Sequence, residues 1–145
     1  MKKLVLGLSF LIIYVFGCLD AYASTPNTSD TTYTFSNTSE PSSTQYRDKH
    51  TSTKVYVYPQ YGPKIYYTVR GCLKIVYPDG NWETSVPSNR SQKVAIPTGT
   101  RGSITNTVYE SGENYACLRL ERINYGYVTT GGYWSPDSTR NYTVY

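Results

Sequence analysis

Few side chains in this sequence could transfer a proton or attack a substrate. The single histidine, His50, lies in the polar stretch Asp48-Lys49-His50-Thr51, where we expect a solvated loop residue and not a general base. With a single histidine expected in a solvated loop and no free thiol expected, we predict neither a serine triad of the usual kind nor a Cys-His nucleophile. A metal site built from His and Cys ligands is excluded for the same reason. We therefore expect no metal and no cofactor.

Two carboxylates at close spacing are the remaining candidate for catalysis. Glu110 and Glu113 flank Ser111-Gly112, and a glycosidase needs only two acids at a set separation. A charged turn explains the same residues more simply, because nothing nearby in the sequence separates an acid role from a base role. Asp79 and Asp137 also lie in turn-forming contexts. The sequence predicts a protein that is not an enzyme, with a two-carboxylate hydrolase as an alternative.

The first 23 residues have the layout of a secretory signal peptide. Lys2 and Lys3 precede an apolar run over residues 4–16, which is shorter than the roughly 20 residues of a spanning helix. We expect cleavage after Ala23, a secreted product and no transmembrane segment in the mature chain. An alternative is a lipid anchor at Cys18, because Val15-Phe16-Gly17-Cys18 resembles a bacterial lipoprotein box.

Removal of residues 1–23 leaves two cysteines, Cys72 and Cys117. An even count outside the cytosol predicts a disulfide between them. We expect a structural bond, since a redox-active pair would be closely spaced beside the start of a helix. In alternating strands both cysteines fall on the less apolar side, which places the bridge on an outer face of the sheet.

Tyrosine is the most informative residue type, with 17 in the chain. So many amphipathic rings exceed what one small core can hide, and exposed Tyr and Trp suit binding to sugars, peptides or headgroups. Cross-strand aromatic pairing explains them equally well. The net charge of +4 is mild and spread along the chain, so we expect no nucleic-acid partner. The predicted binding surface consists of Tyr125, Tyr127, Tyr133, Trp134 and Arg140.

The chain outside the leader divides into two regions. In residues 24–50, 13 of 27 positions are Ser or Thr, which predicts a flexible linker, although Tyr33-Thr34-Phe35 alternates and could add an edge strand. Residues 51–145 contain short alternating segments rich in Tyr, Val, Ile and Thr, separated by turn signals such as Pro78-Asp79-Gly80-Asn81. This pattern predicts one all-β domain, an antiparallel β-sandwich of seven or eight short strands.

The segment 127–138 ends in Gly132-Tyr133-Trp134-Ser135-Pro136-Asp137-Ser138. It resembles the ending of small exported proteins of Gram-positive bacteria that have no assigned function and that end in a Gly-x-Trp-Ser-Pro-Asp-Ser-like stretch. In general style the chain is also similar to lactococcin-like bacteriocins, which disturb cell-wall synthesis, but it departs from them in its predicted disulfide and long linker. The resemblance carries over no functional residues.

These observations together predict a non-catalytic binding module at the bacterial cell envelope, with a cell-wall glycan or a surface protein as its partner. The alternatives are a bacteriocin-like toxin or antagonist and, third, the two-carboxylate hydrolase. The sequence does not determine the oligomeric state.

Overall fold

A computed structural model describes residues 24–37 and 40–145, and these residues form strands and loops without a helix. The predicted signal peptide and Cys18 lie outside the described residues. No helix in the described part of the chain could cross a membrane. The strands are β1 Thr31–Asn37, β2 Ser42–Ser43, β3 Arg47–Asp48, β4 Val55–Tyr61, β5 Ile65–Cys72, β6 Lys74–Val76, β7 Trp82–Thr84, β8 Ser88–Asn89, β9 Val94–Ala95, β10 Gly102–Ile104, β11 Tyr115–Arg122, β12 Val128–Ser135 and β13 Thr143–Val144.

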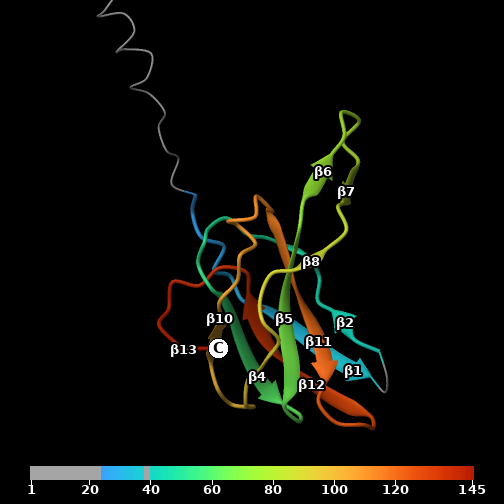
Figure 1. Ribbon diagram of the computed structural model, residues 1–145, viewed down its shortest axis with the longest axis vertical. Coiled ribbons are helices and arrows are strands. Elements are labelled where there is room, and N and C mark those ends of the chain that lie inside the picture. Colours follow the sequence, from blue (N-terminus) through green and yellow to red (C-terminus); the bar gives the residue numbers. More distant parts are fainter. Residues whose placement is uncertain (1–23, 38–39) are drawn as a thin grey trace, which may run out of the picture.

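The strands form two main sheets that pack face to face (Figure 1). Sheet A has the order β1-β12-β4-β10-β13, and sheet B has the order β2-β11-β5-β8, with β3 on β11 and β9 on β5. Strands β10 and β13 are parallel, and the other pairs are antiparallel. The all-β class and the sandwich-like layering expected from the alternating segments are therefore present. The described part of the chain contains more strands than the seven or eight expected, because several short segments of only two residues also pair with the sheets.

The core lies between the sheets and follows from the alternation of apolar residues. Val55 and Val57 on β4, together with Trp134 on β12, face the side chains of Tyr67 and Val69 on β5 and Leu118 on β11. The hydroxyls of Tyr33 and Tyr67 form a buried hydrogen bond of 2.8 Å across the two layers. Because each phenol satisfies the other, these two polar tips are tolerated inside the core.

The Ser/Thr-rich segment belongs to the sandwich, which corrects its interpretation as a linker. Strand β1 pairs with β12 over its whole length, from Thr31 opposite Trp134 to Asn37 opposite Val128. Tyr33 and Phe35 are buried in the core, and the intervening hydroxyl side chains face outward. The two aromatic side chains supply the burial that offsets the entropy of ordering this segment. The domain therefore includes residues before Thr51.

Cys72 and Cys117 are free thiols, which corrects the predicted disulfide. Both point to the outer face of sheet B, as their parity indicated, but the register places Cys72 opposite Tyr115 and Cys117 opposite Arg70. The two cysteines are thus diagonal neighbours on adjacent strands, a relation of roughly 7–8 Å that exceeds the usual Cα separation of a disulfide. The thiols are nevertheless fully buried, and the Tyr46 side chain hydrogen-bonds to Cys117.

Gly131 and Gly132 lie within β12, where they allow a close approach to β4. A Cβ on Gly132 would come within 2.0 Å of the Tyr58 carbonyl oxygen, and the pairing of β12 with β4 shifts register between the two glycines. A Cβ on Gly131 would come within 2.4 Å of the Tyr61 hydroxyl. The Gly-Gly pair therefore allows a bulge in the middle of sheet A.

Candidate functional site

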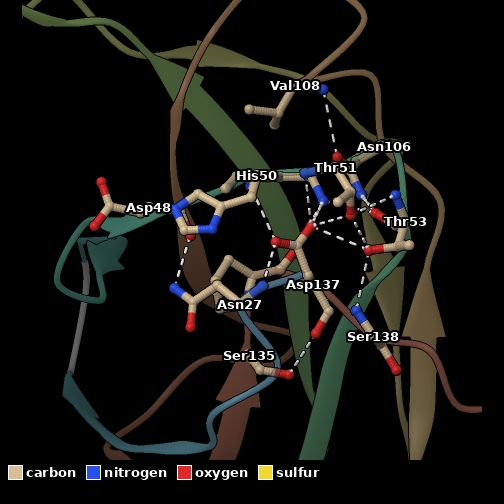
Figure 2. A network of polar contacts seen from close by, with 12 residues as sticks. Asn27, Asp48, His50, Thr51, Thr53, Asn106, Val108, Ser135, Asp137 and Ser138 are labelled. Atoms are coloured by element: carbon tan, nitrogen blue, oxygen red, sulfur yellow. Dashed lines mark hydrogen bonds and ion pairs between the residues drawn. The ribbon is translucent and has the colours of Figure 1, made fainter. Parts of the chain in front are cut away.

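The most connected polar side chain in the described structure is the carboxylate of Asp137 (Figure 2). Its Oδ1 accepts hydrogen bonds from the hydroxyls of Thr51 at 2.8 Å and Thr53 at 3.0 Å, and from the Thr51 backbone N–H at 3.3 Å. Its Oδ2 accepts from the backbone N–H groups of Asn27 at 2.8 Å and His50 at 3.0 Å. Asp137 thus joins the N-terminal segment, the loop before β4 and the segment that follows β12.

Lys49 completes this cluster, which we call the Asp137 network (Asn27, Lys49, His50, Thr51, Thr53 and Asp137). Its ammonium group donates to Asp137 Oδ1 at 2.9 Å and to the carbonyl oxygens of Pro136 at 2.9 Å and Thr53 at 2.6 Å. Both charged side chains are 0% exposed. The three donors of the ammonium group are each used, so the buried charge is both paired and fully hydrogen-bonded.

Burial and hydrogen bonding act in opposite directions on the Asp137 carboxyl group. Burial alone would raise its pKa, but the hydrogen bonds from the His50 backbone, the Lys49 ammonium and the Asn27 backbone lower the pKa to about 2. Burial lowers the pKa of Lys49, and the adjacent Asp137 carboxylate opposes that effect. A carboxylate held ionised by six donors is a poor general acid, so the network is suited to stabilising the fold.

The other predicted catalytic candidates are separated or occupied. Glu113 is buried and forms a bidentate ion pair with Arg90, whose Nε and Nη2 donate to the two carboxylate oxygens at 2.8 Å and 2.7 Å. Glu110, in contrast, is exposed in the preceding turn. His50 is exposed, and its Nδ1 lies 2.9 Å from the Thr25 carbonyl oxygen. Within the described residues no group of His, Cys, Asp or Glu has the arrangement of a metal site.

The predicted aromatic surface is divided by the fold. Tyr125 and Tyr127 are 97% and 69% exposed in the connection between β11 and β12, where the Arg122 guanidinium lies over the Tyr125 ring. Trp134 does not belong to this surface, because it is 1% exposed and packs in the core under the Arg47 guanidinium. Tyr133 is half-buried on the outer face of sheet A.

Arg140 lies beyond the other end of β12, beside the Tyr56 ring and the Tyr142 hydroxyl. The β12 strand therefore separates Tyr127, which precedes it, from Arg140, which follows it. The structure does not bring Arg140 together with Tyr125 and Tyr127. Of the five residues predicted to form the binding surface, only Tyr125 and Tyr127 are both strongly exposed and close together in the chain.

A second exposed apolar surface, absent from our sequence predictions, lies on the β6–β7 hairpin. This hairpin projects beyond the sandwich in Figure 1 and pairs only with itself. Val76 and Trp82 face each other across it and are 63% and 57% exposed. The large exposed apolar side chains of the hairpin, including its base, are Leu73, Ile75, Val76, Tyr77 and Trp82.

The hairpin is fixed in position despite its exposure. At its base, Leu73 and Ser85 exchange two hydrogen bonds of 2.9 Å, and the Lys74 backbone N–H donates to the Asn114 side chain at 2.9 Å. The Lys74 ammonium lies 5.1 Å from the Trp82 ring centroid. At the tip, Gly80 adopts a φ of 86°, as the turn requires. The apolar side chains are therefore presented on a defined scaffold.

A family described as "Protein of unknown function (DUF2712)" matches residues 19–138. The chain belongs to this family. The matched residues include every member of the Asp137 network and the whole β6–β7 hairpin, so both features lie within the family region. A search of curated proteins finds no match to the chain, and a search of solved structures finds none either.

Proposed function

We propose that this protein is secreted and acts as a non-catalytic binding module at the bacterial cell envelope, with the β6–β7 hairpin as its principal contact surface. The observation that supports this proposal most is the exposure of five large apolar side chains on one projecting, two-stranded element. Apolar side chains gathered on an exposed element are typical of interaction sites. Contact with a partner would cover them.

The chemistry of the hairpin favours a protein or glycan partner over the interior of a bilayer. Its tip carries Asp79, whose carboxylate accepts hydrogen bonds from the backbone and side chain of Asn81, and burying this charge in lipid would be costly. Trp82 and Tyr77 instead offer flat rings with polar edges, and the Tyr77 hydroxyl already bonds to Glu83. Such groups stack on sugar rings or pack against peptide side chains.

The ionisable groups support a role without catalysis. Asp137 lies in a fully buried ion pair and Glu113 in a partly buried one, and each carboxylate already accepts hydrogen bonds from charged or backbone donors. A hydrolase acid must instead be free to exchange a proton with the substrate.

We propose secretion because residues 1–23 have the layout of a signal peptide.

The proposal is tested by sedimenting the purified protein with isolated cell walls and with intact Gram-positive cells, and by counting viable cells in the same tubes. A Val76→Ser, Trp82→Ala double variant should lose about tenfold or more of its retention, because central aromatic contacts commonly contribute over 1 kcal/mol each. The matched control is Tyr109→Ala, which removes a ring that is 47% exposed outside the hairpin. It should bind as the wild type does.

Each other outcome changes the conclusion in a defined way. Equal retention of the double variant and the wild type would reject the hairpin as the contact surface, and a loss with Tyr125→Ala instead would assign contact to the β11–β12 connection. Soluble sugar or peptide fragments released from the walls would overturn the non-catalytic role. Loss of viable cells would favour a toxin.

A further inference from the structure

The edges of the two main sheets differ in how well they are protected. Strands β2, β8 and β13 are two residues long, and short edge strands are one way in which proteins prevent pairing with other chains. Strand β1 is the outermost strand of sheet A and is seven residues long. It contains no proline and no charged residue, and its pairing with β12 runs without a bulge. Among the described edges, β1 is the one that lacks these protections.

The sequence of β1 reads nearly the same in both directions about Thr34. Tyr33 and Phe35 flank it, followed by Thr32 and Ser36, and then by Thr31 and Asn37. If a second β1 lay antiparallel to the first with Thr34 opposite Thr34, aromatic residues would face aromatic residues on the inner side. Hydroxyl residues would face hydroxyl residues on the outer side, and such matched cross-strand pairs stabilise antiparallel sheets.

Space is available beside this edge. A pocket of about 360 Å³ borders the first half of β1. It is lined by residues 31–34 and Trp134 of sheet A and by residues 43–45, at the β2 edge of sheet B. A strand added to β1 would extend sheet A over this opening. No charged side chain of β1 would repel its copy across the axis.

We propose that β1 is a self-association edge, at which two copies of this chain pair antiparallel about Thr34 and join their A sheets into one continuous sheet. The isologous arrangement requires one patch that complements itself, and the near-palindromic order of β1 provides it. A pair of this length would form about six backbone hydrogen bonds between the copies. The edge pairing leaves the β6–β7 hairpin of each copy uninvolved, so this inference is independent of the proposed function.

The test is the molar mass in solution combined with site-specific crosslinking. Analytical ultracentrifugation of the mature protein from about 1 µM to 1 mM should show a concentration-dependent dimer, because a single strand pair buries less than a standard interface. Thr34→Lys places two ammonium groups opposite each other and should shift the dimer dissociation constant upward by about tenfold or more. Thr129→Lys is the matched control, since it places the same charge on the outer face one strand inside the edge.

Crosslinking tests the register directly. Thr34→Cys should form an intermolecular disulfide on mild oxidation, because residues directly opposite in an antiparallel pair have Cβ atoms about 4.5–5.5 Å apart. Thr129→Cys should remain largely uncrosslinked. A protein that stays monomeric to 1 mM, or a dimer that is unaffected by Thr34→Lys and does not crosslink through Thr34→Cys, would overturn the proposal. Unchanged thermal unfolding of the lysine variants serves to show that each chain still folds.

Discussion

Replacing Asp137 with asparagine should destabilise the protein severely. The carboxylate accepts from six donors, whereas the asparagine amide offers one acceptor oxygen and adds an NH2 group. If the NH2 group occupies the Oδ2 position, it meets the N–H groups of Asn27 and His50. If it occupies the Oδ1 position, it meets the Lys49 ammonium. In either orientation donors face donors in a site that water does not reach.

Two independent estimates give the size of the effect. Removing one partner of a buried ion pair costs about 3–5 kcal/mol, because the other charge stays buried without compensation. The pKa of Asp137 lies at about 2 instead of the ordinary 3.8, which corresponds to about 2 kcal/mol of stability from the ionised form. A folded-state pKa below the unfolded value means that this stability is present above pH 4 and is lost as the pH falls to 2. We therefore expect Asp137→Asn to lower the free energy of unfolding by about 2–5 kcal/mol.

Urea denaturation followed by tyrosine fluorescence, at pH 7 and at intervals down to pH 2, measures both effects. The wild type should lose stability between pH 4 and pH 2 by more than the Asp137→Asn variant does. Adding Lys49→Met to that variant should restore part of the loss, because it removes the unpaired charge. The control is Asp79→Asn, in the exposed hairpin turn. A loss below 1 kcal/mol for Asp137→Asn would refute the reasoning.

Two further predictions concern the sheet interiors. Gly132→Ala should lower the free energy of unfolding by about 1–3 kcal/mol in the same urea experiment, because the alanine Cβ would lie 2.0 Å from the Tyr58 carbonyl oxygen. An unchanged urea midpoint would mean that β4 can move away from β12 without cost. Burial raises the pKa of the Cys117 thiol to about 11 and also raises that of Cys72. Both thiols should resist iodoacetamide at pH 8 in the native protein and should be alkylated after unfolding without a reductant. Peptide mass spectrometry locates the alkylated residues. Alkylation only after reduction would contradict the presence of free thiols.

The sequence reveals local features of this fold more readily than distant ones. Alternation around Val55 and Val57 and the turn at Asp79 predict strands and a hairpin, because these signals depend only on neighbouring residues. The alternation of Tyr33 and Phe35 indicates strand β1 only as an alternative to a linker, since Phe35 is paired opposite Thr130, which lies far along the chain. The same limit applies to Asp137, which looks like a turn residue until Asn27 and Lys49 supply its donors.

The exposed hairpin illustrates a second limit. Leu73, Ile75 and Tyr77 continue the parity of the buried residues of β5, and nothing in their spacing indicates that the covering sheet has ended. Whether an apolar strand is buried depends on the layer opposite it, which a single sequence does not specify. The candidate binding surface could therefore be found only from the three-dimensional arrangement.

The Asp137 network also orders events in time. Asn27 is synthesised 110 residues before the carboxylate to which its N–H donates. During synthesis, or during passage through a membrane with the N-terminal side first, the charge of Lys49 therefore has no Asp137 to pair with. Contacts between such distant residues are slow to form, so the chain should remain loosely folded until its last strands emerge. If the protein is secreted as we propose, this delay would aid its export, because its most stable arrangement becomes available only after most of the chain has crossed the membrane.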